Sequence, residues 1–173
     1  MELQIRQERP EDADAVARVI ADAFDDESVA AFTDELRASP GYVAELTFVA
    51  EEDGDVVGFT MLSEVAVEGV PRPVLTLTPM AVRPDRQREG IGAALVRAAL
   101  AAAEERGEPL VLVEGVPSYY PQFGFLPATM LGLERPDDRI PEEAWLALPL
   151  RAYDPAIRGR VVYPSFFPPP PGA

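Results

Sequence analysis

The chain has 173 residues, with 30 acidic and 15 basic side chains, and its formal net charge at pH 7 is −15. It contains no cysteine and no histidine, which excludes disulfides, thiolate nucleophiles, cysteine-ligated zinc and Ser-His-Asp hydrolysis. The acidic balance argues against a nucleic-acid partner, because binding to a phosphate backbone requires a basic surface.

The length suits one folded domain, which we place at residues 1–160, followed by a proline-rich tail at residues 161–173. No apolar run approaches the roughly 20 residues that a membrane-spanning helix needs, and no signal-peptide pattern comes before the first predicted strand. We therefore expect a cytoplasmic protein without a membrane partner.

The first third of the sequence predicts a strand, two helices and the start of a hairpin. Leu3 and Ile5 alternate with polar residues, as in a half-buried strand. A helix is predicted after Pro10, because apolar residues then recur at helical spacing, namely Val16, Val19, Ile20, Ala23 and Phe24. A second, short helix carries Val29, Phe32 and Leu36. Asp53-Gly54 between two apolar runs, 46–51 and 56–67, indicates a two-residue hairpin turn.

The rest of the chain predicts further strands around one long helix. A strand is expected over 74–82, where Pro79 indicates a bulge or an unpaired edge because proline has no N–H to donate. The helix over 91–106 has one apolar face and a glycine to end it, with the residues Ile91, Leu95, Ala99, Ala102 and Gly107. The apolar run 110–113 is typical of a central strand. A short helical segment over 119–123 and strands over 125–133 and 145–153 complete the prediction.

The junction between the strand 74–82 and the long helix carries most of the functional information. Arg83, Arg86 and Arg88 concentrate positive charge there, against the acidic trend of the whole chain. Gly90 and Gly92 open the helix, where the first N–H groups have no intrahelical acceptor and the helix dipole is positive. Such a turn binds phosphate, because a backbone without a Cβ lets ligand oxygens approach several donors together.

Three kinds of phosphate-binding turn follow a strand and open a helix as this junction does. A Walker loop requires a lysine, and the chain has none, while a dinucleotide fingerprint requires a small residue where Leu95 stands. The pattern Gln87-x-x-Gly90-x-Gly92 after a strand ending in Ala-Val resembles the acetyl-coenzyme A loop of the GNAT acyltransferase superfamily. An ordinary solvated turn is the alternative.

A second segment resembles the same superfamily independently. Residues 118–125 read Ser-Tyr-Tyr-Pro-Gln-Phe-Gly-Phe, in which Tyr120 lies four residues before Gly124, as in the family segment that ends in Gly-Phe. Together with the Thr-Pro-Met-Ala-Val run at 78–82, the doubled tyrosine is similar to a branch of small bacterial GNAT proteins. The two motifs occur in the order and at the separation that the family requires.

The resemblance implies the fold and the co-substrate. It implies an α/β fold with a mixed, mostly antiparallel central sheet, flanked by helices, in which a parallel pair of strands ending at Val82 and Val113 splays apart. It implies acetyl-coenzyme A as co-substrate and no metal. The expected cofactor-binding residues are Met80, Ala81, Val82, Gln87, Arg88, Glu89, Gly90, Ile91, Gly92 and Ala93.

Acyl transfer to an amine needs alignment, oxyanion donors and a proton, but no nucleophilic side chain, so the absence of cysteine and histidine is tolerable. We expect a backbone N–H near Ala81 or Val82 to face the oxyanion and Tyr120 to protonate the leaving thiolate. Glu114, at the end of the central strand, is the candidate base. The alternatives are a packed tyrosine with a satisfied hydroxyl and a merely solvated glutamate.

The acceptor is expected to be a primary amine on a small, cationic molecule. Acidic residues lie in both segments that correspond to the variable walls of the acceptor site in this superfamily, and they are Asp25, Asp26, Glu27, Asp137, Asp138, Glu142 and Glu143. Solvated loops explain the same acidity. Two other functions stay open, namely a non-catalytic acyl-coenzyme A binding or regulatory domain and a structural oligomer-forming domain. A homodimer is compatible with the resemblance.

Overall fold

The computed structural model describes residues 2–169, and these form two compact units. The first unit contains the chain up to Ser63 together with Thr78–Ala103, and the second contains Glu64–Leu77 and the chain from Glu104 onward. Strands β3 (Asp55–Val67) and β4 (Val74–Val82) each contribute one part to either unit.

The first unit is built on antiparallel strands. Strand β1 (Leu3–Gln7) pairs with β2 (Tyr42–Glu52), which pairs with β3, and β4 follows β3 in the order of this unit. The turn between β2 and β3 consists of Asp53 and Gly54, with φ of 52° and 86°. Two successive positive φ values are typical of the tight turn that joins twisted strands, so the predicted hairpin is confirmed.

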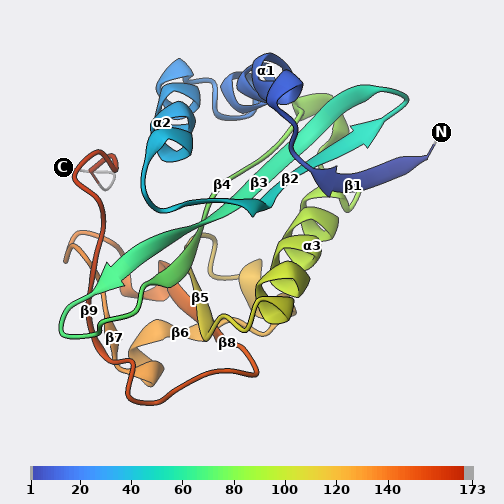
Figure 1. The fold of residues 1–173 in the computed structure, drawn as a ribbon. Coiled ribbons are helices and arrows are strands. Elements are labelled where there is room, and N and C mark those ends of the chain that lie inside the picture. The colour runs from blue at the N-terminus through green and yellow to red at the C-terminus, as the bar shows by residue number, and fades with distance from the viewer. Residues whose placement is uncertain (1, 170–173) are drawn as a thin grey trace. The chain divides into compact units, whose positions relative to one another are not determined.

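Three helices accompany these strands. After a short 3₁₀ segment, η1 (Pro10–Asp12), come α1 (Ala13–Phe24) and α2 (Glu27–Ala38), and α3 (Ile91–Glu105) follows β4. Figure 1 shows α1 and α2 on one side of the strands and α3 on the other. Phe24 differs from the prediction, because 45% of it is exposed at the end of α1. In α3 the last buried residue is Ala103 instead of the predicted Ala102, since the series Ile91, Leu95, Ala99 continues at a spacing of four residues.

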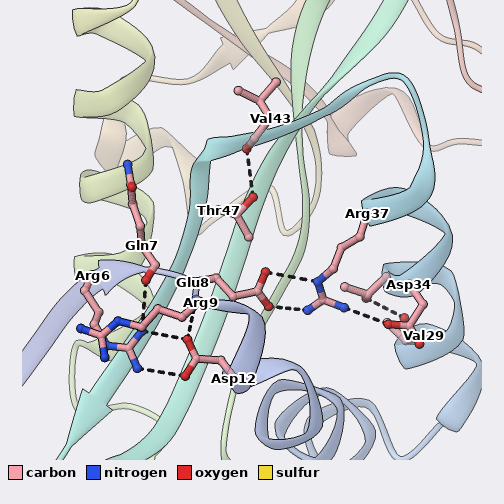
Figure 2. Close-up of polar contacts among 11 residues, drawn as sticks. Arg6, Gln7, Glu8, Arg9, Asp12, Val29, Asp34, Arg37, Val43 and Thr47 are labelled. Atoms are coloured by element: carbon pink, nitrogen blue, oxygen red, sulfur yellow. Dashed lines mark hydrogen bonds and ion pairs between the residues drawn. The ribbon is translucent and has the colours of Figure 1, made fainter.

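Two partly buried arginines, Arg6 and Arg37, join the segments of α1 and α2 to the strands, as Figure 2 shows. The Arg6 guanidinium donates to both oxygens of Asp12, at 2.8 and 3.0 Å, and also to Glu51 on β2. The Arg37 guanidinium on α2 donates to both oxygens of Glu8, which follows β1. Hydrogen bonds from Arg6 lower the pKa of the Asp12 carboxyl below its usual value, so this carboxylate stays charged where the chain enters α1.

The second unit contains the parallel pair that the fold class requires. Strand β4 pairs in parallel with β5 (Leu110–Glu114), through Leu75 with Val111 and Thr76 with Leu112. On its other edge β5 pairs antiparallel with β8 (Trp145–Pro149), which also pairs with β6 (Leu126–Pro127). The mixed, mostly antiparallel pairing with β4 parallel to β5 confirms the predicted α/β class.

A small group of strands closes the second unit. Strand β9 (Gly159–Val162) pairs with the end of β3 and, in parallel, with β7 (Leu133–Glu134). Trp145 lies at the centre of the core, fully buried, and its indole N–H donates to the Leu133 carbonyl at 3.0 Å. Strand β9 was not predicted, and it runs through the proposed domain boundary at residue 160. The boundary itself remains a prediction.

Two predicted strands are corrected. The segment 125–133 is not one strand, because a 3₁₀ turn, η4 (Ala128–Leu131), and Gly132 at φ 74° separate β6 from β7. The strand predicted over 145–153 ends at Pro149, since proline has no N–H to continue the ladder. The strands over 3–7, 74–82 and 110–114 and the helix from 91 agree with the prediction. None of the helices in residues 2–169 has the length and apolar character needed to span a bilayer.

Candidate active site

The turn from β4 to α3 lies in the first unit and is held by its own backbone and by one amide side chain. The Arg83 N–H donates to the Val57 carbonyl on β3 at 2.8 Å, and a 3₁₀ turn, η2 (Pro84–Arg86), follows. The Gln87 side-chain amide donates back to the Val82 carbonyl at 3.0 Å. Gln87 therefore fixes the shape of the turn with the side-chain nitrogen that was expected to reach a ligand.

The last residues before α3 adopt the conformation that a backbone anion site needs. Arg88 and Gly90 both have positive φ, at 65° and 87°, and a Cβ built on Gly90 would meet no atom within 4 Å. The Ala94 N–H donates to the Gly90 carbonyl at 3.0 Å, which is a first-turn bond of the helix. The N–H groups of Ile91, Gly92 and Ala93 precede this bond, so helix geometry leaves them without an intrahelical acceptor.

The three arginines of the turn differ in what they contact. Arg83 forms an ion pair with Asp85 at 2.6 Å, and Arg86 is held between Glu52 and Glu89. No hydrogen bond or ion pair joins the exposed Arg88 side chain to another residue within 2–169. Arg88 is thus the arginine of the turn whose charge is available to a ligand, whereas acids inside the protein neutralise the other two.

Close packing against β3 fixes the position of the first turns of α3. Gly58 on β3 lies under the first turns of this helix, where a Cβ would come within 2.9 Å of the Leu95 side chain and 3.2 Å of Ile91. The same Cβ would lie 3.3 Å from the Ala81 carbonyl of β4. The missing side chain lets the helix N-terminus and the end of β4 approach β3 together, which holds the turn between them in a defined position.

The end of β4 presents alternate residues to its two faces. Ala81 is buried, whereas Met80 and Val82 are partly exposed. Pro79 follows a cis peptide bond, and its carbonyl accepts a hydrogen bond from the Thr60 hydroxyl at 3.2 Å. Met80, Ala81 and Val82 are therefore continuous in the chain with the turn, and they belong to the same unit.

Tyr120 lies in the second unit, in the 3₁₀ segment η3 (Tyr120–Phe123). Its ring is 7% exposed and lies against the backbone of Gly115, where a Cβ would come within 2.4 Å of the ring. Phe125 packs edge-on against the same ring, with 5.6 Å between the centroids. Burial raises the pKa of Tyr120 to about 12, with a smaller contribution from Tyr119, so the phenol keeps its proton at neutral pH.

The Tyr120 hydroxyl has no hydrogen-bond partner among the residues that the structure describes. Within residues 2–169, the Ser63 hydroxyl is fully enclosed by protein and has no partner, whereas the Tyr120 hydroxyl is not fully enclosed. The hydroxyl is therefore neither satisfied by a neighbouring residue nor sealed in the core. This arrangement argues against the alternative of a core tyrosine with a satisfied hydroxyl.

Glu114 is exposed at the end of β5 and lines a pocket of about 340 Å³ in the second unit. Desolvation raises the pKa of its carboxyl above the usual value, and the nearby Asp137 carboxylate adds to the shift. No hydrogen bond or ion pair joins Glu114 to another residue within 2–169. The side chain is thus an unpaired carboxylate with increased proton affinity, at the opening of a cavity.

Some of the acidic residues that were expected to line the acceptor site are paired with neighbouring residues instead. Asp26 caps α2 by accepting from the Ser28 N–H at 2.9 Å, and Asp137 forms an ion pair with Arg139 at 2.6 Å. Glu68, Tyr163 and Phe167 line the same pocket as Glu114, and no sequence motif predicted them as site residues. The aromatic run before the final prolines was the available signal, but its position in space depends on long-range packing.

Comparison with known proteins identifies the family. The sequence model described as the acetyltransferase (GNAT) domain matches residues 4–128. The chain belongs to the GNAT acetyltransferase family. GNAT enzymes use acetyl-coenzyme A, and the family assignment makes the chain an acyltransferase, which confirms the predicted family and enzyme class.

Individual GNAT proteins resemble the chain over most of its length. The uncharacterized N-acetyltransferase YhbS of Escherichia coli K12 is 28% identical over 121 residues, which cover 70% of this chain and 72% of YhbS. A crystal structure of Escherichia coli YhbS in complex with CoA covers 96% of this chain and 92% of its own, with a TM-score of 0.87 and 27% identity. A GNAT acetyltransferase from Brucella melitensis in complex with acetyl-CoA covers 96% and 99%, with a TM-score of 0.79 and 30% identity. These neighbours confirm the GNAT fold.

Proposed function

We propose that the chain transfers the acetyl group of acetyl-coenzyme A to a primary amine of a small, cationic acceptor by direct attack. The observation that carries the proposal is the turn before α3, which combines free helix N-terminal amides with the unpaired Arg88. A turn of this kind offers several donors to one anion, which suits the diphosphate of the coenzyme. The neighbours crystallised with CoA and acetyl-CoA support the same co-substrate.

The coenzyme fits the chemistry of this turn. The amides at Gly90, Ile91, Gly92 and Ala93 would receive the diphosphate, and Gly90 leaves space for its oxygens. Arg88 would add one charged donor, and hydrogen bonds to charged groups contribute about 1.5–3 kcal/mol each. Glu89 would contribute through its backbone, since its carboxylate is paired with Arg86.

The strand that leads into the turn would orient the thioester. Backbone groups of Met80, Ala81 and Val82 would pair with the extended arm of the coenzyme. A backbone N–H near Ala81 or Val82 would then face the carbonyl oxygen as negative charge develops on it. Preorganised donors of this kind stabilise the transition state more than the ground state, which is what accelerates the reaction.

Tyr120 would act as the general acid. Its raised pKa keeps the phenol protonated at neutral pH, and its hydroxyl has no partner within residues 2–169 to compete for the proton. When the amine nitrogen attacks, the C–N bond forms and the C–S bond breaks. The leaving thiolate then takes the phenol proton, and a proton lost from the attacking nitrogen restores the phenol.

Glu114 would act as the base that prepares the amine. An acceptor ammonium must lose one proton before its nitrogen can attack, and a carboxylate with a raised pKa binds that proton more readily than an ordinary glutamate. The pocket that Glu114 lines also contains Glu68, whose carboxylate has no hydrogen-bonded or ion-paired partner within residues 2–169. This acidic lining supports a cationic acceptor.

The test compares two arginines of the same turn. Arg88→Gln should weaken acetyl-coenzyme A binding by about tenfold, which corresponds to losing one charge-assisted contact. Arg83→Gln is the matched control, because Arg83 is already paired with Asp85 and should leave the affinity within about twofold. Thermal shift measures binding, and thiol release with a panel of amines measures transfer. Equal weakening in both variants would contradict the role of Arg88, and no thermal shift of the unmodified chain with acetyl-coenzyme A would reject the proposal.

A further inference from the structure

The pocket beside Glu114 lies wholly within the second unit, and its lining has two chemical characters. Its volume of about 340 Å³ is at the lower end of the range for small-molecule sites, which is about 300–1,000 Å³. More than half of the lining residues are apolar, and they include proline rings and the aromatic side chains of Tyr163 and Phe167. The remainder is charged and includes Glu68 and Glu114.

The side chains of Tyr163 and Phe167 form an aromatic wall of the pocket, and this wall packs against the core of the unit. The Tyr163 ring lies 6.4 Å from the ring of the buried Trp145, in an edge-to-face arrangement. The Phe167 ring lies 4.7 Å from the Tyr163 ring, and both pack on the buried cluster around Trp145. Val162, which adjoins them in the lining, is 42% exposed and offers an apolar contact without a cover. The wall is therefore a preformed surface for an apolar group.

The charges of the lining are not all available to a ligand. Asp137 and Arg139 form an ion pair at 2.6 Å, and Arg160 forms an ion pair with Asp138 at 3.8 Å and donates to the Arg135 carbonyl at 2.9 Å. Neither the Glu68 carboxylate nor the Glu114 carboxylate has a hydrogen-bonded or ion-paired partner in the described chain. The charges left for recognition are thus two carboxylates beside an aromatic wall.

We propose that this pocket binds the acceptor as a compact primary arylalkylammonium ion, with the aromatic ring against Tyr163 and Phe167 and the ammonium at Glu68 and Glu114. The inference rests on the proposed function, which it deepens by naming the substrate class. A dication without an apolar body would leave the wall uncovered, and an anion would meet both carboxylates. Only a cation with a flat apolar body satisfies both parts of the lining.

Neighbouring groups favour an ammonium at this end of the pocket. Burial raises the pKa of the Tyr163 phenol well above its usual value, and the Glu114 carboxylate raises it further. Tyr163 therefore stays neutral and presents a π face, toward which cations are attracted. Aromatic rings also pair edge-on or offset with an aryl substituent, which adds to simple burial of apolar area.

The first experiment uses four small probes with the full-length chain. Phenethylammonium combines both features, 2-phenylethanol lacks the charge, phenylacetate reverses the charge, and putrescine lacks the ring. The single tryptophan, Trp145, reports occupancy through its contact with Tyr163, so fluorescence titration measures binding without turnover. We expect phenethylammonium to bind at least about tenfold more tightly than each of the others. Equal or tighter binding of phenylacetate or putrescine overturns the inference.

The second experiment tests whether phenethylammonium binds in this pocket. Glu68→Gln removes a carboxylate that has no part in the proposed chemistry, and Phe167→Ala removes part of the wall. Each should raise the dissociation constant of phenethylammonium by about tenfold. Glu105→Gln, at an exposed position at the end of α3, is the control for lost charge and should change nothing. Circular dichroism of each variant checks the fold, and unchanged binding in both folded pocket variants overturns the inference.

Failure of this inference and failure of the proposed function give different results. If thiol release occurs with amines but Glu68→Gln and Phe167→Ala leave the KM for phenethylammonium unchanged, transfer is retained and the pocket assignment is wrong. If phenethylammonium binds with the expected dependence on both residues but no amine is acetylated, the pocket assignment is retained and the proposed transfer is wrong.

Discussion

The proposed coenzyme turn in the first unit and the Glu114 region in the second unit differ in how their charges are paired. In the turn, acidic neighbours neutralise Arg83 and Arg86, and backbone amides remain as donors. The Glu114 carboxylate and the Tyr120 phenol have no hydrogen-bonded or ion-paired partners among the described residues, and burial raises the pKa of each. In the proposed roles, the anion site relies on rigid backbone dipoles, whereas proton transfer relies on side chains whose pKa values are shifted by desolvation.

The largest effect is expected where the turn is blocked. Gly92→Glu places a carboxylate in the first turn of α3, where it fills the space of the diphosphate and repels it. We expect acetyl-coenzyme A binding to become undetectable by thermal shift and calorimetry. Ala101→Glu adds the same charge at an exposed position of the same helix and should bind as the unmodified chain does. Retained binding in Gly92→Glu would mean that the coenzyme does not use these amides.

The next effect separates binding from chemistry. Tyr120→Phe removes a hydroxyl without a described partner, so the fold should persist, while general acid catalysis typically contributes about 10²–10⁴ in rate. Turnover should fall within that range, and the affinity for acetyl-coenzyme A should stay within about twofold of the original. Tyr119→Phe, which removes the neighbouring phenol, is the control. Unchanged turnover in Tyr120→Phe would show that another group protonates the thiolate.

The smallest effect concerns the cost of keeping Glu114 ionised. Its pKa is raised in the folded chain, so the neutral acid is favoured there, and stability is lost as pH rises from the unfolded pKa through the folded one. Glu114→Gln should therefore unfold at a higher temperature than the unmodified chain at neutral pH. The difference should be a few degrees at most, since about 1 kcal/mol moves the midpoint by about 2–4 °C at this length.

The pH dependence of that difference is the sharper measurement. Below the ordinary glutamate pKa of about 4.3, the carboxyl is neutral in both the folded and the unfolded chain, so the two proteins should unfold alike. The same substitution should lower turnover at neutral pH, so a more stable protein would be a slower enzyme. Glu105→Gln, at an exposed position at the end of α3, is the control. A lower midpoint for Glu114→Gln at neutral pH would contradict the desolvation of Glu114.

Local patterns predicted the elements that carry the coenzyme turn. Strand β4, the glycine-opened start of α3 and the hairpin at Asp53-Gly54 depend on neighbours within a few residues, so the sequence contains their determinants. The strand predicted over 125–133 failed because Gly132 and a 3₁₀ turn interrupt it. The two-residue strands β6 and β7 are defined by pairing with β8 and β9, which are distant in the sequence. A short stretch of sequence does not contain that information.

The candidate site shows the same division. Tyr120 and Glu114 were found from a motif and from a strand end, and their roles remain proposals. The neutralisation of Arg86 by Glu52 joins residues 34 positions apart, and the wall formed by Tyr163 and Phe167 depends on packing against Trp145. Such long-range contacts decide which charges are available to a ligand. The sequence shows three arginines in the turn but not which of them are paired with acids.

The pairing of Arg83 and Arg86 with acids affects how the coenzyme is captured in solution. The whole chain carries a formal charge of −15, so a polyanion approaching from afar meets a repelling field. At physiological ionic strength that field decays over about 8 Å, and within this distance the dipoles of the α3 N-terminus and one unpaired guanidinium act. Dissolved salt would therefore speed encounter by screening the repulsion, while contacts made at touching distance would change little.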